Sequence, residues 1–130
     1  MVEFTDAMKI AASGMHAQAS RLRHVSENIA NTDTPGYRRK TVSFEAMVEA
    51  GRRTGEVTTG AVRLDRTELP RVYDPSHPMA DDTGHFDGSN VNLLIEITDA
   101  REAQRTYEAN LKMFEQIRQM SSAINDLMRR

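Results

Sequence analysis

The amino-acid sequence predicts a mainly α-helical protein, in which two long terminal helices form a coiled-coil-like pair around a small middle segment rich in strands and loops. Apolar residues recur at spacings of three and four near both ends of the chain. Between these ends, Gly, Pro, Thr and Val replace that pattern. We therefore divide the 130 residues into segments 1–36, 37–89 and 90–130, which are expected to build one structural unit.

The first helix is predicted over residues 5–31. Thr5 is the expected N-cap, and Asp6 lies in the first turn, where the helix dipole favours an anion. The helix should end at Asn31, because turn-forming residues follow and Pro35 has no backbone N–H to donate. Its narrow apolar stripe predicts a contact with a partner helix and consists of Met8, Ala11, Met15, Gln18, Leu22, Val25 and Ile29.

The middle segment is predicted to contain short strands joined by long loops. Residues 41–44 alternate, residues 56–64 are rich in Thr and Val, and residues 71–73 form a short extended piece. Two or three such strands are marginal in water without a helix against one face. We expect part of this segment to become ordered only against a neighbour.

A second, longer helix is predicted from Asn90 to Met128, with Asn90 or Asn92 as its N-cap. Its apolar stripe comprises Ile97, Ala100, Gln104, Tyr107, Leu111, Phe114, Ile117, Ser121, Ile124 and Met128. A helix of about 35 residues is roughly 50 Å long, which is more than a domain of this size can cover. The expected mate is the first helix, with surface left over for other subunits. This pattern predicts a structural protein that assembles and argues against an enzyme.

Composition excludes several classes of function. The net charge of −2 and the pI near 6.1 argue against a nucleic-acid-binding protein. The chain has no Cys, and no apolar run approaches the roughly 20 residues that span a bilayer. The N-terminus lacks the basic and apolar regions of a secretory signal peptide. We expect no cofactor, and export, if it occurs, without cleavage of the N-terminus.

Two polar clusters admit a second interpretation. One is a Gly- and Pro-rich loop that carries possible metal ligands, but their spacing matches no established site and favours a solvated loop; they are His77, Asp81, Asp82, His85 and Asp87. The basic run at residues 38–40 is short and lacks interleaved aromatic residues. It is therefore interpreted as the start of a strand that faces the acidic residues of a neighbour rather than as a phosphate site.

Three residues of the first helix have a structural and an assembly interpretation. Gly14 costs about 1 kcal/mol of helix stability relative to Ala. It marks either tolerated strain or a close approach of helices in the assembly, and we slightly prefer the close approach. Asn28 and Asn31 are suitable caps for the end of the helix. We additionally expect both to bond to a neighbouring chain.

Two runs in the N-terminal segment resemble the bacterial flagellar rod/hook axial protein family. The first, from Ala11 to Gln18, reads AASGMHAQ, and the second, from Glu27 to Tyr37, reads ENIANTDTPGY. The run from Ala100 to Asn110, AREAQRTYEAN, is similar to the terminal helix of a proximal rod member of this family. The direct Thr34–Tyr37 junction resembles instead the sister proximal rod protein, which stays the alternative, whereas the C-terminal run favours the first member.

The resemblance implies a subunit that polymerises helically into the proximal rod of the basal body, transmits torque and encloses the export channel. The implied partners are other copies, rod proteins of the FlgB, FlgF and FlgG types, the rod adaptor FliE, the MS-ring protein and the type III export apparatus, but no nucleic acid or small-molecule substrate. A soluble helical chaperone or regulator is the alternative. The expected assembly interface comprises Met8, Met15, Leu22, Val25, Asn28, Ile29, Asn31, Pro35, Gly36, Tyr37, Ile97, Tyr107, Asn110, Leu111, Phe114, Ile117 and Ile124.

Overall fold

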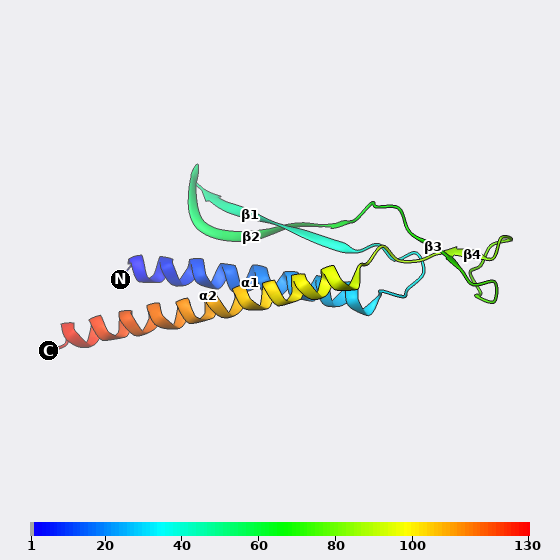
Figure 1. Ribbon diagram of the computed structural model, residues 1–130. Helices are drawn as coiled ribbons and strands as arrows, with labels where there is room; N and C mark the ends of the chain where they lie inside the picture. The colour runs from blue at the N-terminus through cyan, green and yellow to red at the C-terminus, as the bar shows by residue number, and fades with distance from the viewer. Residues whose placement is uncertain (1) are drawn as a thin grey trace.

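Two long helices dominate the computed structural model, which describes residues 2–130 (Figure 1). Helix α1 spans Val2–Ala30, and α2 spans Leu93–Met128 with 36 residues. The strands are β1 (Lys40–Glu49), β2 (Arg52–Leu64), β3 (Arg71–Tyr73) and β4 (His85–Asp87). The predicted fold class, a pair of terminal helices with a small middle segment that contains strands, is confirmed.

The ends of the two helices test the predicted caps. Helix α1 begins at Val2, so Thr5 lies inside the helix and the prediction of Thr5 as N-cap is wrong. Its acidic first-turn residue is Glu3 rather than Asp6. Of the two alternatives for α2, the structure selects Asn92, whose side chain accepts a 3.1 Å hydrogen bond from the Leu94 backbone N–H.

Helices α1 and α2 pack antiparallel, so that both chain ends lie at one end of an elongated molecule (Figure 1). Their contacts fix the register: Arg21 lies 3.4 Å from Asp99, and a Cβ atom added to Gly14 would lie 2.7 Å from the side-chain nitrogen of Asn110. The close approach predicted at Gly14 therefore occurs within the chain. Helix α2 continues past the start of α1, and residues 122–130 are all exposed.

Strands β1 and β2 form an antiparallel hairpin that lies along α1 (Figure 1). The hairpin is longer than predicted. Its two-residue turn, Ala50 and Gly51, has φ values of +50° and +80°, as type I′ hairpin turns require. The Val57 backbone N–H donates a 3.0 Å hydrogen bond to Ser13 Oγ, which attaches β2 to α1. The predicted need for a helix against the strands is thus met by the chain's own helix.

Residues 65–91 form a small lobe at the end of the molecule opposite the chain termini (Figure 1). Within it, β3 pairs with β4 in antiparallel register, with Val72 opposite Phe86. The strand β4 was not predicted. The phenyl ring of Phe86 stacks on the His77 imidazole with ring centroids 4.0 Å apart.

The apolar core is small. Among residues 3–130, for which burial is described, the buried apolar side chains are Ala11, Ala17, Val25 and Ala103. Many large apolar side chains are exposed instead, on both the hairpin and α2. Within residues 2–130, neither helix has a stretch apolar and long enough to cross a bilayer.

Candidate functional site

A buried polar cluster joins α1, α2 and the start of β1. At its centre is Asn28, which is fully buried. The Asn28 side-chain oxygen accepts hydrogen bonds from the Tyr37 hydroxyl (2.9 Å) and the Lys40 backbone N–H (2.8 Å). Its nitrogen donates to the Lys40 carbonyl (2.9 Å) and to Glu96 Oε2 (3.3 Å). An amide has two donor and two acceptor positions, so Asn28 makes every hydrogen bond it can within the chain.

The second member of the cluster is the ion pair between Arg39 and Glu96. Glu96 Oε1 accepts a 2.6 Å hydrogen bond from Arg39 Nε, and the Glu96 side chain is fully buried. Burial disfavours the charged guanidinium, but its hydrogen bond to Glu96 and the nearby charges of Glu96 and Asp65 raise the pKa of Arg39 overall. The guanidinium also lies 3.6 Å from Asp65 and 3.8 Å from Asp99. The guanidinium therefore keeps its charge.

This corrects the interpretation of the basic run at residues 38–40. The acidic partners belong to the chain itself: Arg39 pairs with Glu96, and Lys40 Nζ lies 3.2 Å from Glu27 Oε2. The hydrogen bond from Lys40 lowers the pKa of Glu27. Arg38 donates to the backbone carbonyl of Thr67 at 2.9 Å. The run thus joins α1, α2 and the lobe.

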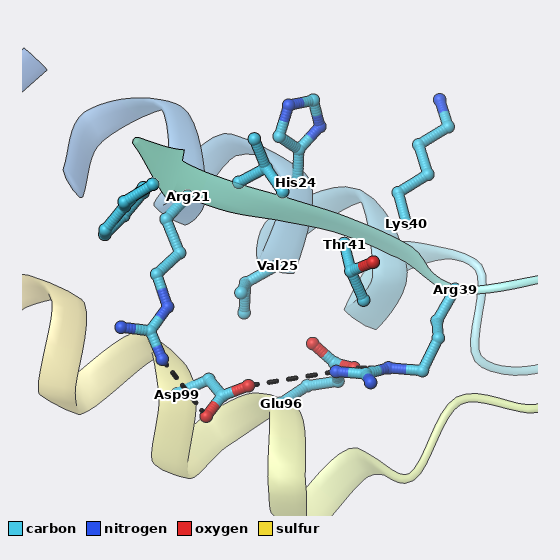
Figure 2. A pocket seen from close by; sticks show the side chains of 10 residues that line it. Arg21, His24, Val25, Arg39, Lys40, Thr41, Glu96 and Asp99 are labelled. Carbon is cyan, nitrogen blue, oxygen red and sulfur yellow. Dashed lines mark hydrogen bonds and ion pairs between the residues drawn. The ribbon is translucent and has the colours of Figure 1, made fainter. Parts of the chain in front are cut away.

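A cleft of about 320 Å³ opens beside the cluster, between the two helices and β1 (Figure 2). Figure 2 shows Glu96 and Asp99 rising from α2 toward Arg39 and Arg21, with Val25 pointing into the space between them. Four of the charged side chains that line it are paired with one another: Asp99 lies 3.4 Å from Arg21 and 3.8 Å from Arg39, and Glu96 pairs with Arg39.

The predicted turn after α1 holds the chain in position to enter the cluster. Asn31 donates from its side chain to the Glu27 carbonyl at 2.8 Å and so caps the end of the helix. The Tyr37 N–H bonds to the Thr34 carbonyl across the turn at 3.2 Å, with Gly36 at φ +75°, a combination typical of a type II turn. Burial raises the pKa of the Tyr37 hydroxyl, which bonds to Asn28.

The predicted interface residues fall into two groups. Inner positions are buried or half-buried in the chain; they are Met8, Met15, Leu22, Val25, Asn28, Ile29, Asn31, Pro35, Tyr37, Tyr107, Asn110, Phe114 and Ile117. The exposed positions are Gly36, Ile97, Leu111 and Ile124. The single apolar stripe predicted for α2 is therefore split, since Glu96 and Ala103 are buried in place of Ile97 and Gln104.

Glu96 and Asn90 are the members of the site that sequence reasoning did not place there, whereas Arg39 was expected to pair with acidic residues of a neighbour. Asn90 accepts from the Arg39 backbone N–H at 2.7 Å and donates to the Asp65 carbonyl at 3.0 Å. Glu96 follows three large aliphatic residues, and as a charged residue it is expected to be exposed. The available signal is the repeat of seven residues that links Glu96, Ala103 and Asn110 and places all three on one helix face.

The loop considered as a metal site is organised by hydrogen bonds instead. Asp81 accepts from the Thr83 backbone (2.9 Å) and hydroxyl (2.6 Å) and from the His85 N–H (3.1 Å), and it pairs with Arg71. The Thr83 hydroxyl and Arg71 hold the pKa of Asp81 well below its ordinary value. No cluster of three His, Asp or Glu side chains within residues 2–130 has the arrangement of a metal site.

An elongated helical pair with a small core, much exposed apolar surface and a polar site occupied by its own charges defines a structural protein of an assembly. Comparison with known families identifies which one. Residues 8–38 match the family described as "Flagella basal body rod protein", and residues 82–127 match "Flagellar basal body rod FlgEFG protein C-terminal".

Several relatives extend over nearly the whole chain. The flagellar basal-body rod protein FlgC of Agrobacterium fabrum is 44% identical over 95% of this chain and 94% of its own length. FlgC of Aquifex aeolicus is 36% identical over 88% of this chain and 89% of its own length. FlgC of Salmonella typhimurium is 32% identical over 85% of this chain and 87% of its own length. The chain belongs to the FlgC family of flagellar basal-body rod proteins. It is a structural subunit of the basal-body rod, and of the two proximal rod members left open by the sequence, the relatives confirm FlgC rather than FlgB.

Proposed function

We propose that this subunit polymerises helically into the proximal part of the rod, where it transmits torque and helps to enclose the export channel. The observation that carries the proposal is the exposed apolar surface of α2. Leu94 and Leu127, near opposite ends of this helix, are 74% and 68% exposed. Exposed apolar surface on this scale marks an interaction site, because a monomeric soluble protein rarely leaves it uncovered.

The inner and outer faces of α2 have separate roles in this proposal. The inner face packs on α1 and gives the subunit its shape. Ile97 and Leu111 on the exposed side contact neighbouring subunits, as does Ile124, which lies where α1 no longer covers α2. The half-buried members of the predicted interface contribute through the edges that remain exposed. Asn28 is withdrawn from the set of interchain contacts, since its hydrogen bonds are all made within the chain.

The segments 1–36, 37–89 and 90–130 then act as one structural unit. The buried polar cluster supports this proposal, since its members come from all three segments. The hairpin, with Met47 and Val48 exposed, and the lobe form the surface that distinguishes one neighbour from another. The neighbours we infer are rod proteins of the FlgB, FlgF and FlgG types, the adaptor FliE and the MS-ring protein.

We further infer that the subunit performs no catalysis and is exported by the flagellar type III apparatus without cleavage of a signal peptide. The paired charges of the cleft support the first inference. The small core supports the second, because a subunit that crosses a narrow channel unfolded must not be too stable.

Assembly is tested with the purified chain by sedimentation velocity and electron microscopy over a range of concentrations. We expect self-association, which Leu111→Asp should abolish because it places a charge in an apolar contact. Gln116→Asp is the matched control, since it adds the same charge at an exposed polar position of α2. Equal loss of assembly in both variants contradicts the proposed interface. A chain that stays monomeric by itself at every concentration, and forms only one-to-one complexes with other rod proteins, supports a helical regulator instead.

A further inference from the structure

The two ends of the molecule carry complementary features. At one end, the lobe has a hollow of about 340 Å³, whose apolar lining includes Pro70, Val72, Phe86 and Val91. Elsewhere in the lobe, large side chains are exposed: Tyr73 is 66% and Met79 is 65% exposed. Because β3 and β4 are only three residues long, the lobe cannot bury these side chains by itself.

At the other end, α2 continues past the start of α1 (Figure 1). We call residues 122–128 the α2 extension; all of them are exposed. Its apolar side chains Ile124, Leu127 and Met128 follow the helical spacing and form one face. The face continues the stripe that packs on α1 further along α2, so it has the pattern of a packing surface without a helix to cover it.

The charges of the lobe and of the segment around the α2 extension are also opposite. The lobe, residues 65–91, contains six Asp and Glu against two Arg. Around the α2 extension, residues 118–130 contain three Arg against one Asp. Of these, Arg129 and Arg130 follow directly on the apolar face and are exposed. At the lobe, Asp33 lines the hollow and Asp82 lies on the loop between β3 and β4, and both are exposed. Opposite charges around an apolar contact steer the partners and set their orientation.

We propose that the α2 extension of one copy docks in the lobe of a second copy of this chain. Leu127 and Met128 enter the hollow near Val72 and Phe86, and the two terminal arginines face Asp33 and Asp82. Because the two surfaces lie at opposite ends of one subunit, the contact is head-to-tail and does not close on itself, so it propagates as an open filament. This inference rests on the proposed self-assembly and assigns its axial contact.

Charge exchange tests the contact. Arg129→Glu/Arg130→Glu should weaken self-association about tenfold, the equivalent of two exposed ion pairs replaced by repulsion. Asp33→Arg/Asp82→Arg should do the same, and an equimolar mixture of the two double variants should restore mixed association. Arg101→Glu/Arg105→Glu is the control: it makes the same charge change elsewhere on α2, and the lobe variant should not rescue it. Circular dichroism of each variant excludes loss of the fold as the cause.

Cysteine cross-linking gives an independent measurement, since the chain has no native Cys. Under oxidation, a mixture of Leu127→Cys and Val72→Cys chains should form a disulfide between one copy of each, whereas either variant alone should form few dimers. If the unmodified chain assembles, but the mixture of double variants does not regain association or no mixed disulfide forms, the lobe contact is overturned. The proposed self-assembly then remains intact. If the unmodified chain does not associate at all, the proposed self-assembly fails and this inference with it.

Discussion

The Glu96 carboxylate is fully buried and accepts a 2.6 Å hydrogen bond from Arg39, 57 residues earlier in the chain. This contact joins α2 to the residue that precedes β1, and Asn28 joins α1 to the same carboxylate. A buried ion pair is weak evidence for stability, because desolvation of both charges offsets their attraction. The hydrogen bonds of this pair do fix the arrangement of the elements, because they form in only one register of α1 and α2 and one path of the chain into the hairpin.

Replacement of Glu96 should therefore be severe. Glu96→Ala leaves the partly buried Arg39 without its strongest partner, and we expect a loss of about 3 kcal/mol in the free energy of unfolding. Asp65 and Asp99 remain near the guanidinium and limit the loss. Urea unfolding followed by circular dichroism measures it. Glu102→Ala, at an exposed position of the same helix, is the control and should change stability little. Equal losses in both variants would show that the buried ion pair adds no more to stability than an exposed carboxylate does.

Asn28→Asp should destabilise the fold in a pH-dependent manner. The change replaces the donor that faces the Lys40 carbonyl and Glu96 with a carboxylate oxygen, so two negative charges meet in a buried site. We expect a loss of about 3 kcal/mol at neutral pH. The loss should shrink toward acidic pH, because the raised pKa of the introduced carboxyl favours its neutral form. Asn28→Ala is the control: it also removes the hydrogen bonds but should show a smaller dependence on pH.

The helices were predictable from the sequence and the buried cluster was not. Spacings of three and four identify both helices, because one face of each packs on the other. The same rule misplaced the buried face at the start of α2, since the predicted Ile97 and Gln104 are exposed, while Glu96 and Ala103 are buried. In an assembling subunit, apolar surface is divided between the chain's own core and its neighbours, and periodicity alone does not separate the two. The length of the hairpin was missed because its turn, Ala50–Gly51, lacks the usual Asn-Gly signal.

Acid should loosen the lobe through Asp81. Its pKa lies below the ordinary value of 3.8, so the ionised form is favoured in the folded lobe and contributes stability above that value. The contribution is lost as the pH falls below 3.8 toward the depressed pKa. Amide hydrogen exchange or NMR of Thr83 and His85 at decreasing pH measures the opening. In Asp81→Asn the lobe should already be looser at neutral pH and should respond less to acid. An unchanged acid response in that variant would assign the effect to other carboxyl groups, such as Asp74.

Gly14 offers the sharpest test of the helix pair. In an isolated helix, Gly14→Ala should stabilise by about 1 kcal/mol. In this fold the added Cβ would lie 2.7 Å from the side-chain nitrogen of Asn110, closer than real Cβ contacts allow, so Asn110 must move. We expect Gly14→Ala to be neutral or destabilising in the unmodified chain, and to stabilise by up to about 1 kcal/mol when Asn110→Ala removes the obstacle. Thermal or urea unfolding of the two single variants and the double variant gives the coupling energy. Additive effects would mean that α1 and α2 do not approach closely at this point in solution, and the antiparallel register of the pair would then have to be revised.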